Sequence, residues 1–270
     1  IRDSYKATLL KGNSLTDLTG GFGIDCAFLA ARFKSATYVE RQQELCEIAA
    51  HNFPILNLNH INVKNEDGVS YLQAMSPVDC IFLDPARRNE HGGKTVAISD
   101  CEPDVAELEE LLLNKAGQVM VKLSPMLDLS LALKELQHVQ EVHIISANNE
   151  CKELLLILGQ ASVEEISIHC VNLPTKGIQE EQHFVFTREQ EQCSECNYTN
   201  VLENYLYEPN ASLLKAGAFR SIASAFPVKK LHPNSHLYTS DVLVESFPGR
   251  AFHIISPVSY THLTLPTIRL

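Results

Sequence analysis

A glycine-rich turn near the start of the chain has the composition of a ligand-binding loop. Its candidate contact residues are Asp17, Thr19, Gly20, Gly21 and Gly23. Glycine has no side chain, so such a turn brings backbone amides and the positive end of the following helix close to a ligand. We expect Asp17 either to support the loop or to meet an amino group of the ligand. A tight turn that binds nothing is the alternative, because short glycine patterns are common.

Two more acids follow the next apolar runs and extend this candidate site. Glu40 comes about twenty residues after the glycine loop, where a carboxylate can accept both ribose hydroxyls of a nucleoside. Asp67 follows a third apolar run and is placed to accept from an adenine amino group. Each could be a plain surface or turn acid, but Asp17 together with Glu40 favours a nucleoside site. A G-x-G-x-x-G dinucleotide site is disfavoured, because Cys26 occupies the last position of that pattern.

The segment Asp84-Pro85-Ala86-Arg87 is the strongest catalytic candidate. It follows an apolar run typical of a central strand, and a carboxylate at the carboxyl end of such a strand opens into the ligand crevice. The adjacent proline fixes the backbone beside it. We expect Asp84 to contact the cofactor and to accept a proton or hydrogen bond from the reacting group, with Pro85 and Arg87 completing the catalytic segment.

Three basic residues, Arg87, Arg88 and Lys122, are the candidate substrate contacts. The chain has a formal net charge of −11 and a pI near 5.4, so its average field repels phosphate. A nucleic-acid partner would therefore have to be met by a local basic patch, which these residues could form. Ordinary surface charges are an equally good interpretation of them.

The candidate residues require a parallel α/β framework that brings strand ends together. Between residues 14 and 160 short apolar runs alternate with amphipathic ones, the pattern of a parallel sheet with crossover helices. The predicted strands cover 14–18, 36–39, 61–63, 78–83, 118–122, 141–146 and 153–158, and the first helices cover 2–10, 24–33 and 42–52. Only six residues separate the last two strands, too few for a helical crossover, so this pair should be antiparallel.

A smaller unit is predicted after the sheet. Residues 165–173 and 183–187 indicate a β-hairpin around Pro174-Thr175-Lys176-Gly177. Residues 200–257 predict an α+β module with a helix over 211–225 and strands over 241–246 and 251–255. The expected organisation is a cofactor-binding domain over 1–160, a hairpin extension or linker over 161–199, the small module over 200–257 and a tail over 258–270.

Several of these motifs together resemble one group of enzymes. Asp84-Pro85-Ala86-Arg87 resembles the Asp-Pro-Pro-Tyr motif of amino-directed methyltransferases and the Asp-Pro-x-Arg motif of RNA uracil methyltransferases. With Val121-Lys122-Leu123-Ser124-Pro125 and the segment 207–217, it resembles, over residues 1–257, a bacterial family of uncharacterised methyltransferases that also carry a ferredoxin-like module and a THUMP-like domain. The resemblance implies a Rossmann-like class I sheet, in which an antiparallel strand ends a row of parallel strands. It also implies S-adenosyl-L-methionine as the cofactor and RNA as the substrate.

This sequence differs from these motifs at two places, and the differences disfavour some of the reactions that the motif-bearing enzymes carry out. Arg87 replaces the aromatic residue that would stack a target base, although a guanidinium can stack or bind phosphate. The segment 122–126 contains no cysteine, so methylation of carbon 5 through a covalent adduct is disfavoured. Direct displacement by a positioned nucleophile is the expected reaction. A small-molecule or protein methyltransferase remains an alternative, as does a noncatalytic RNA-binding protein on a degenerate methyltransferase fold.

Composition predicts a cytoplasmic protein without a metal. No run of eighteen apolar residues and no signal-peptide pattern occurs. Cys26, Cys46, Cys80 and Cys151 lie in apolar patterns that suit reduced thiols. The lone CxxC of residues 193–196 lacks two further zinc ligands nearby. At the ends, we expect an N-terminal portion to be missing and residues 258–270 to be a non-native, adapter-derived tail. The THUMP-like domain would begin there, so we expect it to be largely absent.

Overall fold

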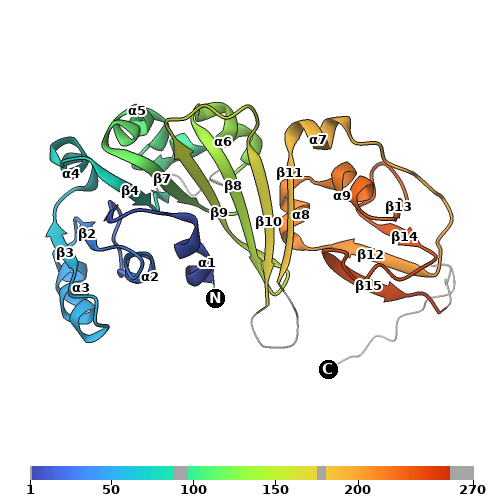
Figure 1. Cartoon of the computed structure of the whole chain (residues 1–270), viewed down its shortest axis with the longest axis horizontal. Helices are drawn as coiled ribbons and strands as arrows, with labels where there is room; N and C mark the ends of the chain where they lie inside the picture. Colours follow the sequence, from blue (N-terminus) through green and yellow to red (C-terminus); the bar gives the residue numbers. More distant parts are fainter. Residues whose placement is uncertain (1, 88–96, 175–180, 256–270) are drawn as a thin grey trace, which may run out of the picture.

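The computed structural model describes residues 2–87, 97–174 and 181–255, and a nine-stranded sheet forms its centre (Figure 1). The strand order is β11-β10-β8-β9-β7-β4-β1-β2-β3. The bounds are β1 Ser14–Asp17, β2 Ser35–Glu40, β3 Ile61–Asn65, β4 Val78–Leu83, β7 Ala116–Leu123, β8 Val139–Ala147, β9 Glu150–Gly159, β10 Ser167–Leu173 and β11 Gln182–Thr187. A separate short ribbon joins β5 (Ala86–Arg87) to β6 (Cys101–Glu102), which follows a 3₁₀ turn at Ile98–Asp100.

Neighbouring strands from β3 through β2, β1 and β4 to β7 are parallel, whereas β9 is antiparallel to both β7 and β8. The predicted antiparallel pair is therefore confirmed. Its short turn has a local cause, because Asn148 and Asn149 both adopt left-handed backbone angles, with φ of 51° and 60°. Asparagine tolerates this conformation, which two-residue hairpin turns require. The fold class is thus α/β, with a mostly parallel sheet that an antiparallel strand interrupts.

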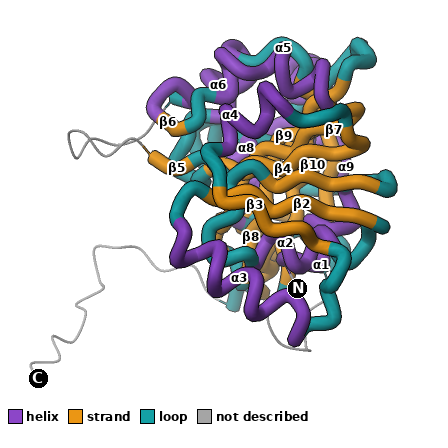
Figure 2. Tube along the Cα trace, turned by 90° about the vertical axis from the view of Figure 1, so that its left-hand side faces the viewer, coloured by secondary structure: helices purple, strands orange, loops and turns teal. Residues whose placement is uncertain are grey.

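Helices cover both faces of this sheet (Figure 2). One hydrophobic cluster packs α4, α5 and α6 against one face, and two others pack α1, α2 and α3 against the opposite face. The bounds are α1 Arg2–Leu9, α2 Ile24–Ala30, α3 Gln43–Ile55, α4 Gly68–Ala74, α5 Val105–Lys115 and α6 Leu129–Glu135. Because both faces are covered, the central strands are nearly continuous apolar runs, as in β4 and β7.

The hairpin predicted after residue 160 exists, but it does not stand apart from the sheet. Strand β10 pairs in parallel with β8, and β11 pairs antiparallel with β10. The hairpin therefore lengthens the central sheet by two strands. The apolar patterns of 165–173 and 183–187 show that strands form, and they contain no signal that identifies β8 as the partner strand.

The C-terminal unit has its own sheet, in the order β13-β14-β12-β15, which packs with short helices. The bounds are α7 Arg188–Cys193, β12 Tyr205–Pro209, α8 Ala211–Ala216, α9 Phe219–Ala225, β13 Lys229–Lys230, β14 Tyr238–Ser240 and β15 Gly249–His253. The single helix expected over 211–225 is wrong, because Gly217 adopts φ of 76° and ends α8. The strand expected over 241–246 is also wrong. Val242 is 74% exposed there, and the paired strand lies just before this segment, in β14.

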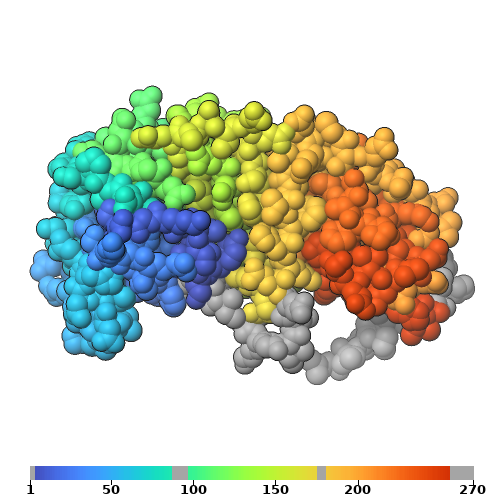
Figure 3. All heavy atoms as spheres, in the orientation of Figure 1, coloured from blue at the N-terminus to red at the C-terminus, as the bar shows by residue number. Residues whose placement is uncertain are grey.

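The two units share one hydrophobic core. Leu213 and Ile222 of the C-terminal helices belong to the same buried cluster as Leu154 and Leu156 of β9. Polar contacts cross the junction as well, since Lys215 donates to the backbone oxygen of Leu127 at 2.7 Å. Figure 3 shows the C-terminal unit packed against the β10–β11 end of the sheet.

Three expectations from the sequence concern membrane helices, the C-terminal tail and the limits of the domains. No helix among the described ranges is long and apolar enough to cross a membrane. The expected non-native tail over 258–270 falls outside the described ranges, and the four domain limits stay a prediction.

Gly217 offers a test of the helix break. Gly217→Ala should lower the free energy of unfolding by about 1–2 kcal/mol, because the Cβ of alanine is strained in the left-handed backbone conformation. Gly217→Asn should cost less, because asparagine tolerates this conformation. Urea unfolding of the two variants measures the difference. Equal stability of both variants and the wild type would show that the break does not depend on the glycine.

Candidate active site

A cavity of about 500 Å³ opens at the carboxyl ends of β1, β2 and β4. Its lining includes five of the residues singled out from the sequence, which are Thr19, Gly21, Glu40, Asp67 and Asp84. These residues come from the glycine loop after β1 and from the ends of β2, β3 and β4. The strand order here is β4-β1-β2-β3, so the four strand ends lie in one row. The topology thus brings together side chains that are far apart in sequence, at the edge where open α/β sheets bind ligands.

The glycine loop is shaped by close backbone approaches. Gly21 and Gly23 have φ of 53° and 75°, a region that strains other residues. A Cβ on Gly20 would lie 2.2 Å from a ring carbon of Tyr38, so only glycine fits there. The Tyr38 hydroxyl of β2 donates to the backbone oxygen of Gly21, and this hydrogen bond fixes the loop against the sheet.

Glu40 holds the same loop from the end of β2. Its carboxylate accepts from the backbone N–H of Gly21 at 2.9 Å and from that of Gln42 at 2.8 Å. A carboxylate has about four acceptor positions, so two hydrogen bonds leave capacity for ligand hydroxyls. Glu40 is 8% exposed and lines the cavity, and its carboxylate is therefore fixed in place before any ligand arrives.

Asp67 has a structural role that is compatible with a binding one. Its Oδ1 accepts from the backbone N–H groups of Val69 and Ser70 at 3.1 and 2.9 Å, which caps the start of α4. The residue also lines the cavity next to Gly68. A Cβ on Gly68 would lie 2.2 Å from the backbone oxygen of Leu18, so the cap packs tightly against the glycine loop.

Asp17 lies beneath the loop and is almost completely buried. Its Oδ1 accepts from the backbone N–H of Thr19 at 3.0 Å, whereas Oδ2 has no hydrogen-bond partner among the described residues. Burial raises the pKa of Asp17 from 3.8 to about 7, and the nearby charges of Asp25 and Asp84 raise it further against the lowering by Thr19 and Lys122. A buried carboxylate with a free oxygen is suited to receive a cationic group.

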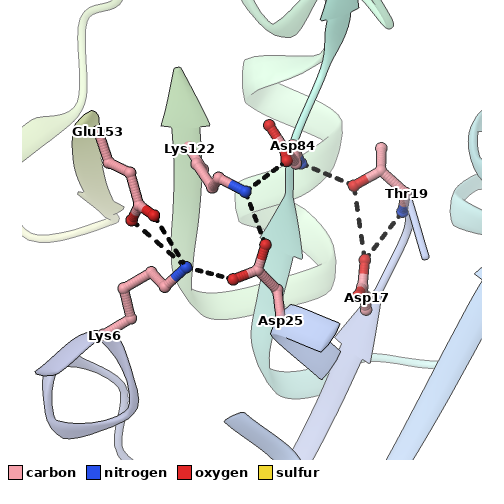
Figure 4. A network of polar contacts seen from close by, with 7 residues as sticks. All are labelled: Lys6, Asp17, Thr19, Asp25, Asp84, Lys122 and Glu153. Carbon is pink, nitrogen blue, oxygen red and sulfur yellow. Dashed lines mark hydrogen bonds and ion pairs between the residues drawn. The ribbon is translucent and has the colours of Figure 1, made fainter. Parts of the chain in front are cut away.

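Asp84 belongs to a network of charged residues that extends behind the cavity (Figure 4). Lys122 of β7 lies 2.7 Å from both Asp84 and Asp25. Lys6 of α1 contacts Asp25 as well, and it lies 3.3 Å from Glu153 of β9. Two ammonium groups thus connect three carboxylates from three parts of the fold.

The network sets the charge states of its members. Burial raises the pKa of Asp84, and the neighbouring Lys122 offsets only part of that effect. Burial also raises the pKa of Asp25, but Lys6 and Lys122 together hold it below its ordinary value. Lys122 itself is partly buried, which lowers its pKa, yet Asp84 and Asp25 raise it by more. Lys122 therefore stays cationic, and of the two carboxylates that it contacts, Asp84 has the higher pKa.

A second contact fixes the backbone of Asp84. Its N–H donates to the Thr19 hydroxyl at 2.6 Å, and that hydroxyl lies 3.5 Å from Asp17 (Figure 4). Pro85 is buried behind it. The glycine loop and the Asp84 corner are thus joined directly, so a shift of one moves the other.

The proposed basic patch is only partly described. Arg88 lies outside the described residues, and for Arg87 only the backbone is described, which pairs with Cys101 in the β5–β6 ribbon. Lys122 is present, but its charge is already shared by Asp84 and Asp25. The substrate role of these three residues stays a prediction.

Several residues of the site were not singled out from the sequence. Asp25 carried a weak signal, because an acid in the first turn of the helix after a glycine loop sits near the ligand. Lys6 and Glu153 carried none, since their contact joins segments that lie 147 residues apart. The cavity wall also includes Glu102, Asp104 and other residues of the 102–108 segment, whose approach depends on the tertiary fold.

Two family models match parts of the chain. A ferredoxin-like domain matches residues 205–248, and protein-L-isoaspartate(D-aspartate) O-methyltransferase matches residues 4–89. The first match coincides with β12, α8, α9, β13 and β14. The second covers the glycine loop, Glu40, Asp67 and Asp84.

Two proteins that are similar to this chain carry the word methyltransferase in their names. A crystal structure of a candidate methyltransferase from Porphyromonas gingivalis W83 is 39% identical, with a TM-score of 0.86 over 96% of this chain. The chain has the fold of that structure. An uncharacterized RNA methyltransferase of Mycoplasma mobile is 34% identical over 76 residues, which is 28% of this chain. The chain spans 66% of the length of the Porphyromonas structure and the match covers 21% of the Mycoplasma protein. The α/β sheet with its ferredoxin-like domain is therefore a methyltransferase fold.

Asp17 makes the stability of the fold depend on pH. The folded chain keeps this proton up to about pH 7, whereas the unfolded chain releases it near 3.8, so the contribution of Asp17 to stability decreases as the pH rises between these values. Asp17→Asn removes the titration. The free energy of unfolding of Asp17→Asn minus that of the wild type should therefore increase from about pH 5 to about pH 7 and then level off. Urea unfolding across this range measures it, and a difference independent of pH would contradict the raised pKa.

Proposed function

We propose that this chain is the catalytic part of an S-adenosyl-L-methionine-dependent methyltransferase that acts on RNA. One observation carries the proposal. Glu40, Gly21 and Asp84, which come from two strand ends and the glycine loop between them, line the same cavity. This is the arrangement that a nucleoside cofactor and a reacting group beside it require.

The residues present fit the cofactor at four points. Glu40 keeps acceptor capacity for the ribose hydroxyls, and Asp67 stands beside it for the adenine amino group. The backbone of Gly21 approaches the ligand without a side chain. Asp17 has a buried oxygen without a described partner, which suits the amino group of the methionine portion. Pairing with that ammonium group would keep Asp17 ionised and would remove the cost of burying its charge.

The reaction we propose is direct displacement on the sulfonium methyl group that the bound cofactor supplies. Asp84 orients the acceptor atom of the substrate and takes its proton, as its raised pKa favours. Lys122 holds the Asp84 carboxylate in position at 2.7 Å, and Thr19 holds its backbone at 2.6 Å. Much of the rate then comes from the fixed positions of the reacting groups.

The name of the Mycoplasma mobile relative supports RNA as the substrate. The charges around the cavity indicate how RNA would bind. Glu102, Asp104 and Glu107 line the wall, so the cavity itself repels phosphate and would admit an uncharged base. Contacts to the RNA backbone would have to come from basic residues outside this acidic wall, and Arg87 and Arg88 remain the candidates that the sequence offers.

Two substitutions separate the catalytic role from the binding role. Asp84→Asn should lower the transfer rate by about 10²–10⁴, with cofactor affinity changed little, because it removes the proton acceptor. Glu40→Gln should weaken cofactor binding by about tenfold or more, because it removes a charged hydrogen-bond acceptor. Calorimetric binding of the cofactor and transfer of its labelled methyl group measure the two effects.

Glu47→Gln, an exposed site on α3, is the matched control for Glu40→Gln and should leave both measurements unchanged. Full transfer activity in Asp84→Asn would show that another residue takes the proton. Absence of cofactor binding by the wild type would overturn the enzymatic proposal as a whole.

The acceptor class has its own test. Labelled cofactor is incubated with the chain and either total RNA or total protein, and the label should enter RNA, with nucleoside analysis identifying the modified base. The match of residues 4–89 to protein-L-isoaspartate(D-aspartate) O-methyltransferase makes protein the alternative acceptor. Label found only in the protein fraction would replace RNA by that acceptor while leaving the cofactor site intact.

A further inference from the structure

Three histidines form a row across adjacent strands at the far end of the sheet from the cavity. His143 lies on β8, His169 on β10 and His183 on β11, and strands β9 and β7 separate β8 from β4. His143 and His169 are direct partners in the strand register, and their rings stack with centroids 4.3 Å apart. The Nδ1 of His169 lies 3.3 Å from the Nε2 of His183.

A carboxylate lies beside this row. Glu141 is two residues before His143 and therefore points to the same face of the sheet. Its Oε2 is 3.0 Å from the Nε2 of His143. His169 also reaches this position, because its Nε2 lies 3.2 Å from the hydroxyl of Ser167, which is the register partner of Glu141. One oxygen of Glu141 and one nitrogen from each of His143 and His169 lie within 4.8 Å of one another.

The Nδ1 atoms of His143 and His169, which face away from Glu141, each have a partner of their own. The Nδ1 of His143 is 2.9 Å from the Tyr5 hydroxyl, and the Nδ1 of His169 faces His183. Metal-binding histidines show this arrangement, in which one nitrogen is held by a neighbouring group and the other is directed at the ion. The outer contacts thus orient both rings toward Glu141.

We propose that Glu141, His143 and His169 bind a divalent transition-metal ion of the Zn²⁺ type. Two histidines and a glutamate are an established ligand set for zinc, with a fourth position left to water. A tetrahedral zinc site has bonds of about 2.0–2.1 Å, so the rings must turn slightly to bring their nitrogens closer than they now lie. The Glu141 side chain is 47% exposed, which gives it freedom to adjust and gives the ion a path from solvent.

The ion would take the position between the Nε2 of His143 and the carboxylate of Glu141. The single proton of the neutral ring would then sit on Nδ1, where it is donated to the Tyr5 oxygen. The ion would join β8 to β10, which is the junction where the hairpin attaches to the central sheet. This proposal departs from the sequence-based expectation of a protein without a metal, which considered only the CxxC motif.

The test uses Co²⁺ as a visible probe for the full chain after treatment with a chelator. The wild type should bind Co²⁺ saturably, with the visible absorption of a four-coordinate ion, and Zn²⁺ should displace it and raise Tm. Glu141→Gln and His169→Gln should each weaken Co²⁺ binding by at least about tenfold. Glu141 is partly exposed and His169 is half-buried, so both variants should fold, which circular dichroism checks.

Two controls identify the site. His51→Gln, on the exposed side of α3, should leave Co²⁺ binding unchanged. The double variant Cys193→Ser with Cys196→Ser should also bind Co²⁺ as the wild type does. Loss of binding in the cysteine variant would assign the ion to the CxxC motif instead. Saturable binding that Glu141→Gln and His169→Gln leave unchanged, or no saturable binding at all, would likewise overturn the proposal.

Discussion

The position of Asp84 depends on a chain of ion pairs that is largely shielded from water. Lys122 lies between Asp84 and Asp25, and Lys6 lies between Asp25 and Glu153. Charges removed from water are costly unless each has a partner, and loss of one partner of a buried pair costs about 3–5 kcal/mol. The first helix of the fold, through Lys6, therefore affects the carboxylate that lines the cavity. This one network holds together α1, the start of α2, the ends of β4 and β7 and the first part of β9.

The local features of the site could be read from the sequence because each has a local cause. Gly20, Gly21 and Gly23 are needed by the turn itself, through close approach or left-handed backbone angles. Asp84 follows an apolar run typical of a covered strand, so its place at a strand end could be predicted from its neighbours in sequence. The short loop before β9 is similar, since its length alone excludes a helical crossover.

The features that the sequence did not reveal depend on contacts between distant segments. The pairing of Lys6 with Glu153 and the row of His143, His169 and His183 exist only because particular strands become neighbours. The attachment of β10 to β8 is of the same kind, since an apolar run does not specify its partner. The helix break at Gly217 is different. A glycine inside a helical pattern was available as a signal, and the pattern around it outweighed that signal in the prediction.

The added hairpin also determines how the two units can move. Strand β10 is hydrogen-bonded to β8, and α8 of the C-terminal unit packs on β8, β9 and β10. The ferredoxin-like unit is therefore mounted on the same sheet as the cavity, without a free linker between them. A long molecule that touched both parts would meet them at one constant spacing. The sheet thus fixes the distance between the cavity and any surface of the C-terminal unit that the same molecule contacts.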